Sequence, residues 1–118
     1  MFRTVKCLSS IKKGDVLTFN TISEVWELAT DLSTSIGVAS EDAFMDQDDN
    51  SRYLVAMSVD GPVSAKASRD IPNQGGRLNV ENGAVYVDND ANHTEIICPN
   101  FIDTAQRKAG ELITIVIR

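Results

Sequence analysis

Apolar and polar residues alternate in short runs along most of this chain, and the clearest run spans residues 75–87. The apolar positions there lie two residues apart on either side of an Asn82-Gly83 pair: Leu78, Val80, Val85 and Val87. A period of two is typical of strands with one buried face. Asn-Gly supplies the two positive-φ residues that a type I′ turn requires. The stretch therefore predicts a β-hairpin.

Similar runs predict further strands, each bounded by turn chemistry such as Lys13-Gly14-Asp15 or Asp60-Gly61-Pro62. These strands cover residues 16–19, 35–40, 53–59, 63–68, 95–98 and 110–118. Gly37 lies inside one of them, which indicates a bulge or a close approach to its backbone. About eight short strands, a turn signal roughly every ten residues and at most one short helix predict an all-β fold, a small β-barrel or sandwich.

Residues 21–32 fit two interpretations. Apolar residues recur there at helical spacing, and Thr21 with Glu24 forms a capping box, which together predict a short amphipathic helix. Residues 25–30 fit a strand equally well. Trp26, the only tryptophan, is interpreted either as a core or half-buried anchor or as an anchor of a subunit interface, where tryptophan is enriched.

Residues 1–10 are assigned to an N-terminal arm or edge strand, and residues 11–118 to a single β domain. Apolar Val5 and Cys7 alternate with polar residues in the first segment. An arm of this kind can add itself to the sheet of a neighbouring protein, because its backbone groups need hydrogen-bond partners. The alternative is a first strand inside the chain's own sheet.

The chain has a formal net charge of −6 and a sequence pI of about 4.6, and its basic residues are scattered. This balance argues against nucleic-acid binding, which usually needs a basic stripe. We find no apolar stretch long enough to cross a bilayer, and residues 1–10 lack the hydrophobic core of a signal peptide. We therefore expect synthesis in a reducing cytoplasm, with Cys7 and Cys98 as buried free thiols. A disulfide between them is the alternative.

Candidate catalytic groups are few, and their spacing matches no catalytic motif. His93 is the single histidine, and no nucleophile-elbow pattern accompanies it. Residues 46–50 begin like a calcium loop, but Ser51 and Met57 stand where an EF-hand needs Gly and a bidentate Glu. The sequence therefore predicts that the protein is not an enzyme and has no catalytic residue, metal site or cofactor.

The order of the glycine-punctuated runs resembles that of the head-decoration, or capsid-cement, proteins of tailed bacteriophages. The resemblance covers nearly the whole chain. It is carried by residues 11–17, 36–39, 55–63, 75–78, 82–86 and 110–113. Residues 13–18 are also similar to the opening of antifreeze-like (SAF) domains, whose β-clip, or β-tulip-like, architecture some decoration proteins share.

The resemblance implies a homotrimer on the outer surface of an expanded phage head, where it binds the major capsid protein and clamps adjacent capsomers. In that family the N-terminal segment commonly reaches onto the shell, which assigns capsid contacts to Phe2, Arg3, Val5 and Lys6. Trp26 is the candidate for the subunit interface. The implied localisation is the exterior of the virion, with neither nucleic acid nor membrane as a partner.

Two other functions stay open. One is a carbohydrate- or ligand-binding β module, either SAF-like or on a virion surface. Its stacking candidates are the aromatic residues Trp26, Tyr53 and Tyr86. The other is a small hydrolase that works with a divalent ion. Its candidate residues are Asp46, Asp48 and Asp88.

Overall fold

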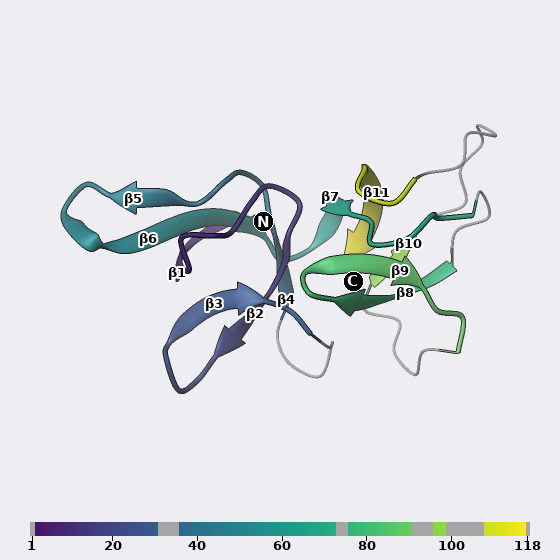
Figure 1. Ribbon diagram of the computed structural model, residues 1–118, viewed down its shortest axis with the longest axis horizontal. Coiled ribbons are helices and arrows are strands. Elements are labelled where there is room, and N and C mark those ends of the chain that lie inside the picture. Colours follow the sequence, from purple (N-terminus) through teal and green to yellow (C-terminus); the bar gives the residue numbers. More distant parts are fainter. Residues whose placement is uncertain (1, 31–35, 73–75, 91–95, 99–107, 118) are drawn as a thin grey trace.

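The computed structural model describes residues 2–30, 36–72, 76–90, 96–98 and 108–117, and Figure 1 shows the path of the chain. Every regular element within these ranges is a strand. The strands are β1 (Phe2–Cys7), β2 (Val16–Asn20), β3 (Val25–Leu28), β4 (Ile36–Ala39), β5 (Phe44–Asp46), β6 (Asp49–Ser58), β7 (Gly61–Lys66), β8 (Gly76–Glu81), β9 (Ala84–Val87), β10 (Ile96–Cys98) and β11 (Leu112–Ile117). The predicted all-β fold is confirmed. The strands are more numerous than predicted, in part because one as short as β5 has too few residues to show a period of two.

The first half of the chain forms a small closed barrel. Its strands follow the order β1-β3-β2-β4-β6, and β6 pairs back with β1, while β5 extends the sheet along β6. Among the described residues these pairings are antiparallel except for β1 with β3, a parallel contact between Cys7 and Trp26. The predicted small β-barrel is therefore confirmed, and residues 2–7 form one of its strands.

The second half forms a sheet of the same design, in the order β7-β11-β10-β8-β9. The described pairings between these strands are antiparallel. A parallel bridge between Ala67, which follows β7, and Val85 of β9 brings the two ends of the sheet together. Ser68 reinforces this bridge by donating its backbone N–H to the carbonyl oxygen of Val85, with an N···O distance of 2.8 Å.

The two halves are copies of one folding unit. Taken in order, β1, β2, β3, β4 and β6 correspond to β7, β8, β9, β10 and β11, and each pairing in one half has a counterpart in the other. The parallel contacts correspond as well, Cys7 with Trp26 in the first half and Ala67 with Val85 in the second. Strand β5 has no counterpart among the described residues of the second half.

A trace of this repeat survives in the sequence. Leu17 of β2 and Leu78 of β8 are both fully buried, and both face the last residue of the partner strand in their hairpin. Around them, residues 14–18 (Gly-Asp-Val-Leu-Thr) align with residues 75–79 (Gly-Gly-Arg-Leu-Asn). The glycine and the leucine are the identical residues of this pair of segments, so the strand order establishes the repeat and the sequence alone does not.

The tip of the β8–β9 hairpin joins the two halves. Asn82 and Gly83 have φ angles of 47° and 77°, which confirms the turn predicted from this pair. The backbone N–H of Gly83 donates to the carbonyl oxygen of Ala29, and the carbonyl oxygen of Gly83 accepts the N–H of Val16, each with an N···O distance of 2.8 Å. The second half is thereby hydrogen-bonded into the end of the first barrel.

Buried side chains form two groups. The group inside the first barrel consists of Cys7, Ile11, Leu17, Ala39, Val55 and Met57. The second group lies mainly within the second half, but it also includes Val16, Ala29 and Val38 of the first half. Because these three side chains pack with the strands of the second half, burial of apolar surface also stabilises the junction between the halves.

Gly37 of β4 fulfils the expectation of a close approach. A Cβ atom added to Gly37 would lie 2.6 Å from the sulfur of Met57. The side chain of Met57 is fully buried in the core of the first barrel, so a larger residue at position 37 would have to displace it. The absence of a side chain at Gly37 is therefore what lets β4 pack over this methionine.

Residues 21–32 contain strand β3, and the helical interpretation is wrong. Residues 21–24 form the turn between β2 and β3. Asn20 sets up this turn, because its side-chain Oδ1 accepts the backbone N–H of Ile22 at 2.9 Å. A side chain that captures backbone N–H groups in this way competes with helix formation. Glu24 completes the turn with a φ of 58°, and residues 31–32 lie outside the described ranges.

Candidate functional site

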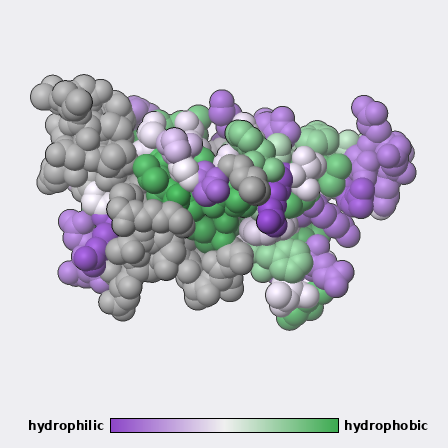
Figure 2. Space-filling model, turned by 180° about the vertical axis from the view of Figure 1, so that it is seen from behind, coloured by the Kyte–Doolittle hydropathy of each residue, from purple (hydrophilic) through white to green (hydrophobic). Residues whose placement is uncertain are grey.

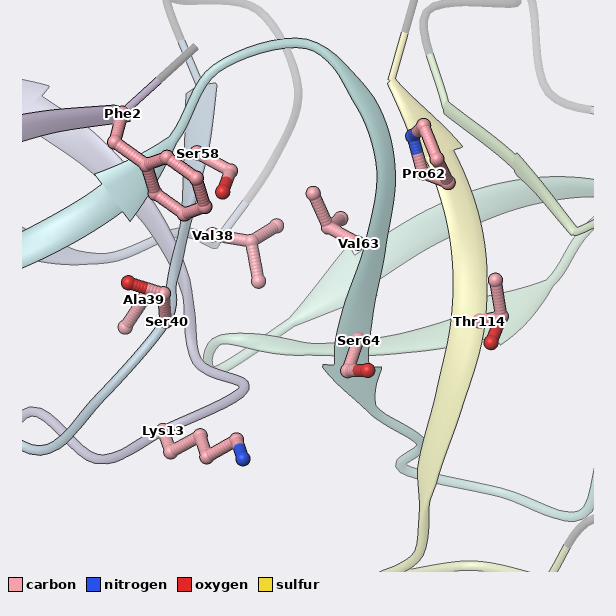
Figure 3. A pocket seen from close by; sticks show the side chains of 10 residues that line it. All are labelled: Phe2, Lys13, Val38, Ala39, Ser40, Ser58, Pro62, Val63, Ser64 and Thr114. Atoms are coloured by element: carbon pink, nitrogen blue, oxygen red, sulfur yellow. The ribbon is translucent and has the colours of Figure 1, made fainter.

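A groove of about 350 Å³ lies between the two halves, where the chain leaves β6 and enters β7. Figure 3 shows it in close view. β4 and the ends of β1 and β6 contribute one side of the groove, and β7 contributes the other. Val38 and Val63 face each other across it. The ring of Phe2, a residue that is 71% exposed, lies on its rim.

Polar groups also line the groove (Figure 3). Ser58 is 6% exposed, and its hydroxyl has no hydrogen-bond partner within the described ranges. Leaving a buried hydroxyl unpaired costs roughly 1–3 kcal/mol. Ser40 differs, because its hydroxyl donates to the carbonyl oxygen of Ala56 at 2.9 Å. Lys13 lies at one end of the groove, so a ligand there would meet a positive charge as well as a buried hydroxyl.

Two hairpins project from the first barrel (Figure 1). The β2–β3 hairpin ends in a turn whose Ile22 is 94% exposed. The β5–β6 hairpin carries Phe44 and Met45, which are 43% and 47% exposed. Seen from behind in Figure 2, the end of the β5–β6 hairpin at the right is hydrophilic, whereas hydrophobic surface reaches the tip of the β2–β3 hairpin at the lower right. The first barrel thus displays apolar side chains at separate places.

The residues predicted to contact a capsid lie on β1. Phe2, Arg3 and Lys6 are exposed, whereas Val5 is half-buried and packs against the core of the first barrel. β1 pairs with β6 along its whole length. The exposed side chains are therefore presented on a strand that is held in the barrel.

The aromatic residues considered for ligand stacking do not form one platform. Trp26 and Tyr53 are half-buried and pack against the core of the first barrel, and the centroid of the Trp26 ring lies 5.7 Å from that of Phe19. Tyr86 lies on β9 in the other half, and the guanidinium of Arg69 covers its ring at 4.1 Å from the centroid. Each of these rings is engaged within the chain, although part of the Trp26 surface remains exposed.

The candidate carboxylates lie apart. Asp46 ends β5 and Asp48 lies in the turn that follows it, whereas Asp88 follows β9 in the second half. Asp46 accepts the Nε–H of Arg52 at 2.7 Å and the backbone N–H of Asp48 at 3.0 Å. We find no group of three or more potential metal ligands in the part of the chain that the structure describes. His93 lies outside the described residues.

Asp46 gives the fold a pH-dependent stability. The hydrogen bonds from the Asp48 N–H and from Arg52 lower the pKa of Asp46 below its ordinary value. Its ionised form therefore stabilises the folded state above the unfolded-state pKa, and this contribution is lost as the pH falls through the folded-state pKa. We expect Asp46→Asn to have a lower melting temperature than the wild type at pH 7, and the difference to shrink below about pH 4. Thermal unfolding followed by circular dichroism, from pH 7 to below about pH 4, measures this difference in melting temperature.

Asp48→Asn is the matched control for this prediction. It removes a neighbouring charge but leaves the hydrogen bonds to the Asp46 carboxylate in place. The melting temperature of Asp48→Asn should follow that of the wild type across the pH range. A pH dependence of the same size in both variants would contradict a specific role for Asp46.

Cys7 is 5% exposed, and burial raises the pKa of its thiol above the ordinary value. The prediction of a buried free thiol is therefore confirmed for Cys7. Cys98 belongs to β10, and its side chain is outside the structural description.

The groove was not among the sites predicted from the sequence. Pro62 is the one local signal that points to it, because proline inside a strand is typical of a sheet edge, and β7 contributes such an edge to the groove. Nothing in the sequence indicates that Val38 and Val63 face each other or that the Ser58 hydroxyl is isolated, because both depend on how the two halves pack.

Comparisons of the chain with protein-family models, with curated proteins and with solved structures found no match. Within the described ranges, no helix is long and apolar enough to cross a membrane.

Proposed function

We propose that this protein decorates the outer surface of an expanded phage head, where it binds the major capsid protein as a homotrimer and clamps adjacent capsomers. The observation that carries the proposal is the exposure of apolar side chains at separate places on an elongated molecule. Ile22 is 94% exposed, Phe2 71% and Phe44 43%, and the principal extents are 46 × 26 × 23 Å. A clamp needs contact surfaces in more than one place, and isolated apolar tips that fit pockets on neighbouring proteins supply them.

The joint between the halves supports a mechanical role. Gly83 is hydrogen-bonded to Ala29 and Val16 of the other half, and the two halves share buried side chains. A force that pulls the two halves apart would have to break the hydrogen bonds of Gly83 and expose the shared buried side chains. A clamp without this joint would extend under the outward pressure of packed DNA instead of holding capsomers together.

Selective binding to the expanded head is sufficient to stabilise that form of the shell. A protein that binds the expanded head and not its precursor shifts the equilibrium toward the expanded form by mass action. Each bound copy needs an interface on the order of 1,000 Å² or more to form a specific contact. The net charge of −6 discourages association with other anionic surfaces.

Sedimentation tests the proposal. We expect the purified protein to sediment as a trimer and to co-sediment with expanded empty heads assembled from a phage major capsid protein. It should not co-sediment with unexpanded heads. A protein that fails to bind expanded heads at micromolar concentration contradicts the proposal.

Two substitutions at the β2–β3 turn sharpen this experiment. Ile22→Asp removes the exposed apolar side chain and adds a charge, whereas Thr21→Asp adds the same charge next to it and keeps Ile22. Both residues are exposed, so neither substitution should disturb the core. We expect at least about a tenfold loss of head binding for Ile22→Asp, which corresponds to about 1.4 kcal/mol, and a smaller loss for Thr21→Asp. Equal losses would assign the effect to charge and not to the apolar contact.

A further inference from the structure

The edge of β7 that faces the groove carries unpaired backbone groups. β7 pairs with β11 along its other edge, on which side the N–H of Ala67 also donates to the carbonyl oxygen of Glu111. The N–H of Lys66 points the opposite way and donates to the carbonyl oxygen of Gly14. Because successive residues of a strand direct their backbone groups to alternate edges, the N–H and C=O of Ser64 point to the same edge as those of Lys66. Neither group of Ser64 has a partner in the described part of the chain.

Pro62 lies two residues before Ser64, so its backbone groups are directed to the same edge of β7. It has no N–H, so the free edge of β7 offers the C=O of Pro62 together with the N–H and C=O of Ser64. A proline on a sheet edge limits how far another strand can extend its pairing. The edge is therefore suited to a short segment and not to a long strand.

Gly14 shows that backbone groups can bridge the gap between the first barrel and β7. Its N–H donates to the carbonyl oxygen of Ala39 in β4, and its carbonyl oxygen accepts the N–H of Lys66 in β7, each with an N···O distance of 2.9 Å. This single turn residue, with a φ of 89°, thus makes hydrogen bonds on both sides of the gap. Lys13, the residue before it, lines the groove, so the groove begins where the chain leaves this gap.

The side chains of the groove define the chemistry of its occupant. Val38 and Val63 supply apolar contacts on the two sides of the groove, the hydroxyl of Ser58 is buried without a partner among the described residues, and Lys13 places a positive charge at one end (Figure 3). An extended peptide meets all of these, because it has backbone groups for β7, a carbonyl or hydroxyl for Ser58, and a small apolar side chain to lie between the two valines. An acidic side chain or a terminal carboxylate would lie near Lys13.

We propose that the groove binds a short extended peptide segment of a partner protein, which pairs with the free edge of β7 at Ser64 and places an acidic group beside Lys13. The proposal does not depend on a capsid, and the experiment below uses the protein alone. Its outcome is therefore separate from that of the head-binding experiment.

The probe is a synthetic library of N-acetylated pentapeptides with alternating small apolar residues and a C-terminal aspartate. Binding is followed by ¹⁵N NMR of the full-length protein, and the tightest member is then titrated alone. We expect saturable shifts at Ser64, Val63 and Ser58, and slower hydrogen exchange of the Ser64 amide in the bound state. No binding by any member at millimolar concentration overturns the proposal, as do shifts that map away from the groove.

The first control changes the peptide and leaves the protein unchanged: the peptide nitrogen whose N–H donates to a carbonyl oxygen of β7 is methylated. Loss of the hydrogen bond from this N–H should weaken binding about fivefold to tenfold. On the protein, Ser64→Pro removes the N–H without removing a bond to β11, whereas Ser64→Ala keeps it. We expect Ser64→Pro to lose affinity to a similar extent and Ser64→Ala to bind like the wild type. Equal binding of the methylated and unmethylated peptides overturns strand pairing, even if Ser64→Pro fails to fold.

Discussion

Replacing Gly83 by alanine is expected to lower the free energy of unfolding by about 2 to 5 kcal/mol, because two penalties add at this position. Gly83 has a φ of 77°, a region that costs an L-residue with a Cβ about 1–2 kcal/mol. The added Cβ would also lie 2.6 Å from Cδ2 of Leu28 in the other half, and such overpacking costs about 1–3 kcal/mol. Urea unfolding followed by circular dichroism measures the loss.

Gly61→Ala separates the two penalties. Gly61 has the same φ of 77°, but a Cβ added there would meet no heavy atom within 4 Å. This variant should therefore lose about 1–2 kcal/mol, the backbone penalty alone. If both variants lose the same free energy, the contact between Gly83 and Leu28 does not constrain the joint between the halves.

A core substitution in the second half is expected to destabilise the first half equally. Ile115 of β11 is fully buried, so Ile115→Ala should lower the free energy of unfolding by about 2–5 kcal/mol. Trp26 lies in the first barrel, and as the single tryptophan it reports on the unfolding of that half. Because the halves share a core, we expect one cooperative transition. The urea midpoint from Trp26 fluorescence should fall together with the midpoint from circular dichroism.

The two midpoints decide whether the chain unfolds as one unit. A Trp26 midpoint that stays at the wild-type value, while the circular dichroism midpoint falls, would mean that the halves unfold independently. Val55→Ala provides the reciprocal test, because Val55 is fully buried in the core of the first barrel. It should lower both midpoints as well.

Features that depend on neighbouring residues could be predicted from the sequence. The turn at Asn82-Gly83 was predictable because positive φ is a property of these residue types, and its angles agree. The close approach at Gly37 was predictable for a similar reason, since a glycine inside a strand is typical of a bulge or of tight packing against its backbone. The all-β class followed from alternation and from the frequency of turn residues.

Features that depend on packing between distant segments could not be predicted. The local pattern of residues 21–32 fits a helix and a strand equally well, and the strand forms where β3 also pairs with the distant strand β1 through Cys7 and Trp26. The repeat was hidden because pairing order is retained where residue identity is not. The groove depends on the burial of Ser58 and on the free edge at Ser64, and both arise only once the two halves have packed.

The internal repeat gives the molecule a polarity. In a symmetric pair, both members would offer the same surface to each other. Here the contact is head-to-tail, because the β8–β9 tip of the second copy docks on the first copy through Gly83. The corresponding β2–β3 tip of the first copy points outward with Ile22 at its end. One polypeptide therefore uses the tip of one hairpin for its internal joint and displays the tip of the equivalent hairpin to its surroundings.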